Sequence, residues 1–370
     1  MINDNAKNDR IVYADLMRIV AAFAVVVLHT AANEWSFTSV YTFDWHVFNF
    51  YDSIVRWCVP VFVMLSGMFF LNPEKEITTA KIFKKYILRI VIALIVWGLF
   101  YNLTQYLFLD SNTKVDYTGR FWFISYAPYY FRMFCYALEQ VVFSQGWYHL
   151  WYLYMIIGLY ILTPIYRIIV KNATQKEFIY LLLIFTFFGF CINMYNNSIT
   201  FVNPDMKVNF RISELINYSC YYFAGYFFSK YEIPKKVKTI IYISGGLSFI
   251  FTIVGTAYLS YKTGKPTQVL YDNLIPTTML EAFTIFLFIK SLSSKIQSSK
   301  TSTIITNISA TTFGIYLLHP FILKIFSEMG ISMHFITPIL AIPLISVSVF
   351  VIAVVVIFLL RKIKICKYIM

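Results

Sequence analysis

Charge is scarce in this chain. Of its 370 residues only 13% are Asp, Glu, Lys or Arg, against about 25% in an ordinary soluble protein. Cysteines are also few: the five are scattered, with no CxxC pair and no histidine at zinc spacing, so the sequence indicates neither a disulfide framework nor a metal site. A GxxxxGK phosphate loop, a soluble domain and a low-complexity tail are all missing. Apolar residues, in contrast, make up 59%, which indicates a protein embedded almost entirely in a membrane.

Apolar runs of membrane length follow one another along the chain. A transmembrane helix needs about 20 mostly apolar residues. Ten windows meet this requirement: 11–32, 48–71, 87–109, 147–170, 178–197, 212–229, 239–260, 272–291, 303–324 and 336–360. The first run is not followed by a small-residue cleavage site, so it is interpreted as a retained helix. We therefore predict an all-α, polytopic bundle of about ten transmembrane helices that forms one domain over residues 1–370.

The net charge of +13 comes from basic residues in short loops between the apolar runs. With the N-terminus inside, the cytoplasmic segments carry 21 Lys and Arg and the opposite side carries 8, as the positive-inside rule requires. This distribution predicts two cytoplasmic termini and a multi-pass protein of the plasma or inner membrane, surrounded by lipid, and it argues against a nucleic acid partner. The longest outer connection, 110–146, is rich in aromatic residues, which predicts an interfacial segment or a lid, or else an aromatic belt only.

The first apolar run carries three groups that lipid should reject, Asp15, Arg18 and His29. On an α-helix, the eleven steps from Arg18 to His29 amount to three turns plus about 20°, so both side chains share one face about 16 Å apart in depth. Asp15 lies three residues before Arg18 and is expected to pair with it. A structural ion pair explains Asp15 as well as a functional role does. Arg18 and His29 on one face favour function, because charges in a span usually face a protein interior or a cavity.

Histidines also lie near the predicted outer ends of two further helices, His149 in the fourth and His319 in the ninth. Histidine is the side chain best suited to proton transfer near neutral pH. Tyr316 lies one turn before His319 on the same face, and Pro320 directly after it is expected to disturb the helix. Three histidines at similar depth are a candidate cluster, although the sequence does not show that they converge.

Other charged residues have competing explanations. Glu281 lies near the centre of the eighth predicted span, either as a protonated structural group or as a hydrogen-bond partner for a substrate. Asp52 and Arg56, four residues apart in the second span, are expected to pair with each other. At the inner end of the third span, the segment KIFKKYILRI places Lys84, Lys85 and Arg89 along one stripe with Lys81. Such a stripe serves topology and lipid headgroups, or it binds the phosphates of an anionic cytosolic ligand.

Several stretches together resemble the acyltransferase 3 family of integral-membrane acyltransferases, especially its surface-polysaccharide O-acetyltransferase branch. These stretches are Asp15-x-x-Arg18 followed after ten residues by His29, then 60–67 (PVFVMLSG), 148–153 (YHLWYL) and 313–319 (FGIYLLH). Their order, spacing and ten-helix layout agree with the family over essentially the whole chain. One position departs from it: where the family often has two arginines three residues apart, this chain has Tyr86 first and Arg89 second, with Lys85 as the candidate substitute.

The resemblance implies transfer of an acyl group, usually acetyl, from cytosolic acyl-CoA to a hydroxyl of a cell-envelope glycan or its lipid-linked precursor. It implies His29 as the general base, with Arg18 and Asp15 beside it in the catalytic motif. Lys84, Lys85 and Arg89 would hold the phosphates of coenzyme A. The candidates for binding the acceptor or for stabilising the oxyanion are Tyr316, His319, His149, Trp151 and Glu281, with Arg18 a further oxyanion donor.

Direct transfer and a covalent acyl-histidine intermediate both fit this chemistry. A transporter or flippase of a lipid-linked sugar is the alternative function, because it too would be a basic ten-helix bundle with intramembrane charges. A membrane sensor is a third class, against which the lack of a soluble output domain argues. Release of free coenzyme A from acetyl-CoA separates the enzyme from both.

Overall fold

The computed structural model describes residues 11–107, 120, 122–143, 146–199, 206–208, 214–292, 299–364 and 366–370. Every regular element among these residues is helical, and no strand occurs among them, which confirms the predicted all-α class. Within the predicted outer connection 110–146, the described part forms η3 and α6, and residues 110–119, 121, 144 and 145 lie outside the described residues. The lid and the aromatic belt therefore stay predictions.

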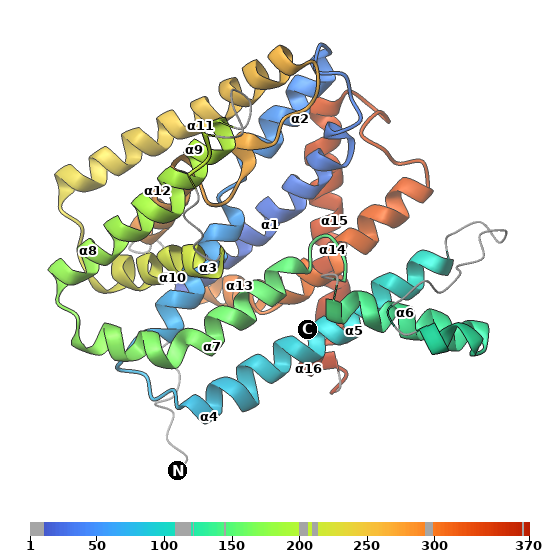
Figure 1. Cartoon of the computed structure of the whole chain (residues 1–370), viewed down its shortest axis with the longest axis horizontal. Coiled ribbons are helices and arrows are strands. Elements are labelled where there is room, and N and C mark those ends of the chain that lie inside the picture. Colours follow the sequence, from blue (N-terminus) through green and yellow to red (C-terminus); the bar gives the residue numbers. More distant parts are fainter. Residues whose placement is uncertain are drawn as a thin grey trace. The chain divides into compact units, whose positions relative to one another are not determined.

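The helices fall in the following order along the chain (Figure 1). Up to the middle of the chain they are α1 (Val12–Trp35), α2 (Phe43–Ser53), α3 (Cys58–Phe70), α4 (Thr79–Lys81), η2 (Ile82–Ile87), α5 (Leu88–Leu107), η3 (Trp122–Tyr126), α6 (Tyr129–Phe143), α7 (Trp151–Asn172), α8 (Gln175–Phe185), η4 (Thr186–Cys191) and α9 (Ile192–Ile199). They continue with α10 (Glu214–Lys230), α11 (Lys235–Thr263), η6 (Val269–Tyr271), α12 (Pro276–Ser291), α13 (Ser299–Ser309), α14 (Thr312–Glu328), α15 (Pro338–Leu360) and α16 (Cys366–Ile369).

Each predicted membrane span overlaps a helix or a helix pair of the structure. In the described part of the chain, eight helices are long and apolar enough to cross a membrane, and a ninth span results if the pair Thr301–Ser309 and Thr312–Glu328, bent by 58°, is counted as one. The remaining prediction, 212–229, corresponds to α10, which has 17 residues. The chain is therefore a multi-pass membrane protein. The cytoplasmic placement of its termini remains a prediction.

The chain divides into two compact units. The first comprises Met1–Lys75 and Arg167–Val356, and the second comprises Glu76–Tyr166 and Ile357–Met370. In the first unit α1 is central, since it packs against α2, α3, α12, α13 and α14, while α3 also packs against α10 and α12. In the second unit, α5 packs against α6 and α16.

Helix α11 in the first unit is apolar on its outer face and polar on its inner face. Its buried positions facing α2 and α12 recur every three or four residues and carry small or hydroxyl side chains: Gly245, Ser248, Thr252, Thr256 and Ser260. Aliphatic side chains are exposed on its outer face: Ile240, Ile243, Leu247, Ile250 and Val254. This arrangement is typical of helices in lipid, where small residues permit close helix contacts and apolar side chains face the hydrocarbon.

Helices α3 and α10 cross with their backbones in contact. A Cβ atom added at Gly67 would lie 2.6 Å from the carbonyl carbon of Tyr222, and one at Gly225 would lie 2.6 Å from the Cα of Met64, where ordinary van der Waals contact is 3.4–4 Å. Gly67 on α3 thus leaves room for the main chain of α10, and Gly225 on α10 leaves room for the main chain of α3. The Ser66-Gly67 end of the PVFVMLSG stretch therefore has a packing reason for its glycine.

Candidate functional site

Asp15 is a buried anchor near the start of α1. Only 1% of it is exposed, and its Oδ1 accepts a hydrogen bond from Arg18 Nη1 at 2.8 Å and another from Ser309 Oγ at 2.7 Å. The predicted Asp15–Arg18 pair is confirmed. The second bond was not predicted, because it joins α1 to α13 across almost the whole chain. Asp15 therefore fixes Arg18 and also ties two helices of the first unit together.

Arg18 lies at an accessible end of the first unit. Its side chain is 31% exposed, and its guanidinium carbon lies 4.5 Å from the ring centre of Phe69. The ammonium of Lys75 lies 4.6 Å from the same ring centre. Two cations therefore share one aromatic ring, each gaining a cation–π contact, so that a positive patch forms at this end of the unit.

His29 and His319 lie together in the interior of the first unit. Their ring centres are 5.2 Å apart, with 31° between the ring planes. His319 on α14 is fully buried and His29 on α1 is half-buried. Two of the three histidines singled out from the sequence are thus neighbours. Because α1 is continuous from Val12 to Trp35, Arg18 and His29 are separated by about 16 Å along its axis.

The backbone of α14 holds the imidazole of His319. Its Nδ1 lies 3.1 Å from the carbonyl oxygen of Ile315, one helical turn earlier. A neutral histidine that donates from Nδ1 carries its lone pair on Nε2. The Tyr316 ring, itself buried, lies 6.3 Å from the His319 ring.

Helix α14 continues through Pro320. It runs without interruption from Thr312 to Glu328, and the 58° bend lies before it, between Ser309 and Thr312. Proline lacks an N–H and cannot donate to the carbonyl four positions earlier, so the disturbance expected at Pro320 does not end the helix.

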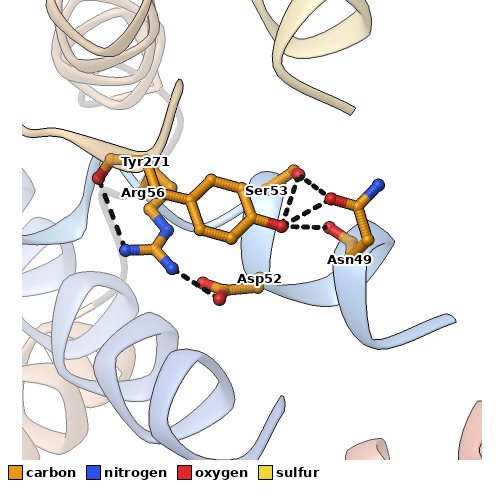
Figure 2. Close-up of polar contacts among 5 residues, drawn as sticks. All are labelled: Asn49, Asp52, Ser53, Arg56 and Tyr271. Atoms are coloured by element: carbon orange, nitrogen blue, oxygen red, sulfur yellow. Dashed lines mark hydrogen bonds and ion pairs between the residues drawn. The ribbon is translucent and has the colours of Figure 1, made fainter. Parts of the chain in front are cut away.

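The predicted Asp52–Arg56 pair is present and belongs to a larger network, drawn in Figure 2. Arg56 Nη2 donates to Asp52 Oδ2 at 2.5 Å, and its guanidinium carbon lies 3.8 Å from the centre of the Tyr271 ring. The Tyr271 hydroxyl donates to Asn49 Oδ1 at 2.5 Å and also contacts Ser53 Oγ at 3.4 Å. The sequence indicated only the charged pair Asp52–Arg56 inside an apolar span. The contact with Tyr271 was not predictable, because Tyr271 lies 215 positions from Arg56.

Glu281 is a further candidate residue in the interior of the first unit. It is fully buried on α12, and its Oε1 accepts a hydrogen bond from Thr252 Oγ1 on α11 at 2.9 Å. Its Oε2 has no hydrogen-bond partner among the described residues. No group of three or more His, Cys, Asp or Glu side chains in the described part suits a metal ion.

The predicted donor-binding cations lie in the second unit, near the start of α5. Lys84 and Lys85 are exposed on the π-helical turn η2, and Arg89 is exposed on the first turn of α5. Arg89 Nη2 donates to the carbonyl oxygen of Met370 at the end of the chain. The π-helical turn was not predicted, because the sequence analysis placed these basic residues on one face by assuming α-helical spacing.

His149 and Trp151 also belong to the second unit. His149 is 2% exposed and meets the ring of Tyr101 edge-on, with ring centres 5.0 Å apart. Tyr101 in turn stacks on Trp147 at 5.3 Å. Trp151 is the first residue of α7 and is half-buried. His149 is thus part of an aromatic cluster at the start of α7.

Comparison with known proteins adds one match. The family model described as an acyltransferase domain, of the acyltransferase 3 type, matches residues 11–360, nearly the whole chain. Neither a curated protein nor a solved structure matches the sequence. The match includes both histidines of the His29–His319 pair and the Arg18–His29 motif of α1. The chain therefore belongs to the acyltransferase 3 family and is a membrane acyltransferase.

Proposed function

We propose that this protein transfers an acyl group, acetyl in the first instance, from cytosolic acyl-CoA to a hydroxyl of a cell-surface polysaccharide or of its lipid-linked precursor, in the cell membrane. The observation that carries the proposal is the His29–His319 pair, two imidazoles 5.2 Å apart inside a helical unit of an acyltransferase. The family supports the transfer of an acyl group. The acetyl donor and the glycan acceptor are the parts proposed here.

The chemistry requires a base close to the acceptor hydroxyl. A sugar hydroxyl has a pKa far above 7, so its attack on a thioester needs a positioned general base. A neutral imidazole, with His29 as the first choice, takes the hydroxyl proton while the oxygen bonds to the carbonyl carbon. The carbonyl electron pair forms an oxyanion, which collapses and expels the coenzyme A thiolate, and the imidazolium returns its proton to that sulfur. His319 lies beside His29, and Tyr316 lies beside His319, so these two residues are the candidates to orient the reacting groups or to donate to them.

A covalent acyl-histidine route remains the alternative to direct transfer. In that route His29 or His319 attacks the thioester carbonyl and the thiolate leaves, and the sugar hydroxyl then takes the acyl group from the imidazole nitrogen. The neighbouring imidazole is placed to act as the base for this second step.

Exposed cations are proposed to bind the donor. Coenzyme A carries phosphate groups, which Lys and Arg side chains bind through charge-assisted hydrogen bonds. Lys84, Lys85 and Arg89 are all exposed near the start of α5. For the acceptor, Glu281 is the candidate hydrogen-bond partner in the first unit, and His149 and Trp151 are separate candidates in the second unit.

The test is acyl transfer by the purified full chain in proteoliposomes, followed with labelled acetyl-CoA and by release of free coenzyme A. His29→Gln is expected to lower turnover by about 100-fold or more, the usual effect of losing a general base. His334→Gln is the matched control, because the His334 side chain is 50% exposed and its Nδ1 lies 3.8 Å from Asp44 Oδ2. Full activity of His29→Gln would remove His29 from the mechanism. Sugar-lipid movement without any release of coenzyme A would instead support the transporter alternative.

A further inference from the structure

The proposed reaction at His29 forms an oxyanion. Arg18, the cation that the sequence analysis named as an oxyanion donor, lies too far from His29 to contact it. An oxyanion donor has to lie about 3 Å from the carbonyl oxygen while the base lies about 3 Å from the attacking hydroxyl. Arg18 is about 16 Å from His29 along the continuous helix α1, and its guanidinium is held by Asp15 and Phe69. Arg18 therefore cannot serve the reaction centre at His29.

Arg56 is a cation of the first unit that lies near the half of α1 carrying His29. The Tyr271 ring, whose centre is 3.8 Å from the Arg56 guanidinium carbon, lies 5.3 Å from the ring of Trp35 on α1. It lies in the break between α2, which ends at Ser53, and α3, which begins at Cys58. Phe43–Phe70 together have the length and composition of one membrane span. A break in a spanning helix is tolerated where the backbone is buried in protein or lines a cavity, and such breaks often carry binding sites.

The surroundings of Arg56 fix its guanidinium, as Figure 2 shows. Its flat face lies 3.8 Å from the centre of the Tyr271 ring, Nη1 donates to the Tyr271 carbonyl oxygen at 3.4 Å, and Nη2 donates to Asp52. The Tyr271 ring is itself held through its hydroxyl by Asn49 and Ser53. A catalytic donor has to be held in this way, because a fixed dipole or charge needs no reorganisation when the oxyanion forms.

The same network leaves hydrogen-bonding capacity unused. Arg56 Nε and Asp52 Oδ1 are both buried and have no hydrogen-bond partner among the described residues. Asp52 is only 1% exposed, and the Arg56 side chain is 17% exposed. A pair retained for stability alone would be expected to use the stronger bidentate geometry, in which both carboxylate oxygens accept from the guanidinium. This pair makes one such bond, so that an N–H donor of Arg56 is available at membrane depth, where an unsatisfied polar group is costly.

We propose that Arg56 is a catalytic residue that donates a hydrogen bond to the thioester carbonyl oxygen and stabilises the oxyanion formed in acyl transfer at His29. Asp52 and Tyr271 act as positioning residues for it. This inference rests on the proposed function. When the acceptor oxygen bonds to the carbonyl carbon, the carbonyl electron pair moves to the oxygen next to Arg56. When the tetrahedral intermediate collapses, that pair re-forms the carbonyl and the thiolate leaves with the proton held by His29. The N-terminus of α3, two residues after Arg56, adds positive potential at the same place.

The experiment compares three variants of the full chain in proteoliposomes. Replacing Arg56 alone would leave Asp52 as an unpaired buried charge, so the main variant is the neutral pair Asp52→Asn with Arg56→Gln. Arg56→Lys is the second variant. It keeps the positive charge but lacks the planar guanidinium group that contacts the Tyr271 ring. The control is Arg167→Lys, another arginine of this unit, which donates to the carbonyls of Phe70, Asn72 and Lys75 at 2.6–2.9 Å and has no part in the reaction. Release of free coenzyme A from acetyl-CoA is measured with water and with methyl glucoside as acceptors, together with the melting temperature.

We expect the neutral pair to lower kcat by about 100- to 1000-fold, as loss of one oxyanion donor does, with the KM for acetyl-CoA within about threefold of the wild type. Arg56→Lys should lower kcat at least tenfold. If the neutral pair does not fold, the kcat of Arg56→Lys alone tests whether Arg56 stabilises the oxyanion. Arg167→Lys should lower the melting temperature without lowering kcat. If the folded neutral pair or Arg56→Lys keeps its kcat within a few fold, the inference is wrong while the proposed function stands. If the wild type releases no coenzyme A with either acceptor, the proposed function fails and this inference fails with it.

Discussion

Replacing Gly67 by alanine should separate two helices that touch through their backbones. The new Cβ would overlap the carbonyl oxygen of Tyr222 and lie 2.6 Å from its carbonyl carbon, where ordinary contact begins at 3.4 Å. Relieving the contact with the carbon alone requires a shift of about 0.8 Å, and the contact with the oxygen requires more, so α3 and α10 have to move apart. Over-packing in a protein interior costs about 1–3 kcal/mol when side chains can adjust. Here the obstacle is main chain, which has no rotamer to change, so we expect a loss of about 3 kcal/mol in the free energy of unfolding.

The same substitution at Gly246 is the control. Gly246 lies on α11, and a Cβ added there has nothing within 4 Å. Alanine at that position should be neutral or should stabilise the helix by up to about 1 kcal/mol, because alanine has the higher helix propensity. Unfolding of both variants in detergent, followed by circular dichroism against temperature and denaturant, measures the difference. Equal stability of Gly67→Ala and Gly246→Ala would refute the backbone contact between α3 and α10.

Three further predictions concern polar contacts. Asp15→Asn removes the charged acceptor of Arg18 and should lower the free energy of unfolding by about 2 kcal/mol, and a melting temperature equal to that of the wild type would contradict the anchoring role. Thr252→Val deprives the buried carboxylate of Glu281 of its hydroxyl donor and should cost about 1–3 kcal/mol; a double-mutant cycle with Glu281→Leu should show that the cost depends on the carboxylate. The hydrogen bond and charge of Lys230 lower the pKa of Glu74 below its ordinary value of 4.5, so the pair's stabilisation is present above that value and is lost as the pH falls through the lowered pKa. The melting difference between Glu74→Gln and the wild type should therefore shrink from about pH 7 to about pH 3, and a constant difference would count against the pair.

The sequence was most informative where a pattern is local. Apolar runs of about 20 residues predicted the spans, and helical spacing predicted the Asp15–Arg18 and Asp52–Arg56 pairs, both of which are present. Long-range contacts were not predictable from spacing. Tyr271 stacks on Arg56 from a distant part of the chain, and one sequence alone does not say which of several hundred positions will meet.

Two local expectations also depended on their surroundings. Pro320 was expected to disturb α14, and the helix nevertheless continues from Thr312 to Glu328. Lys84 and Lys85 were expected on one face of an α-helix. They lie on a π-helical turn, which changes the angle between successive side chains. The histidines illustrate both situations: His29 and His319 were candidates by residue type and depth, and only the packing of α1 on α14 makes them neighbours.

The paired glycines of α3 and α10 have a mechanical consequence. Where main chain rests on main chain, no side-chain torsion is available to absorb a displacement, so these two helices can shift only as one rigid piece. Arg56 lies two residues before α3, so its position is tied to that of the α3–α10 pair.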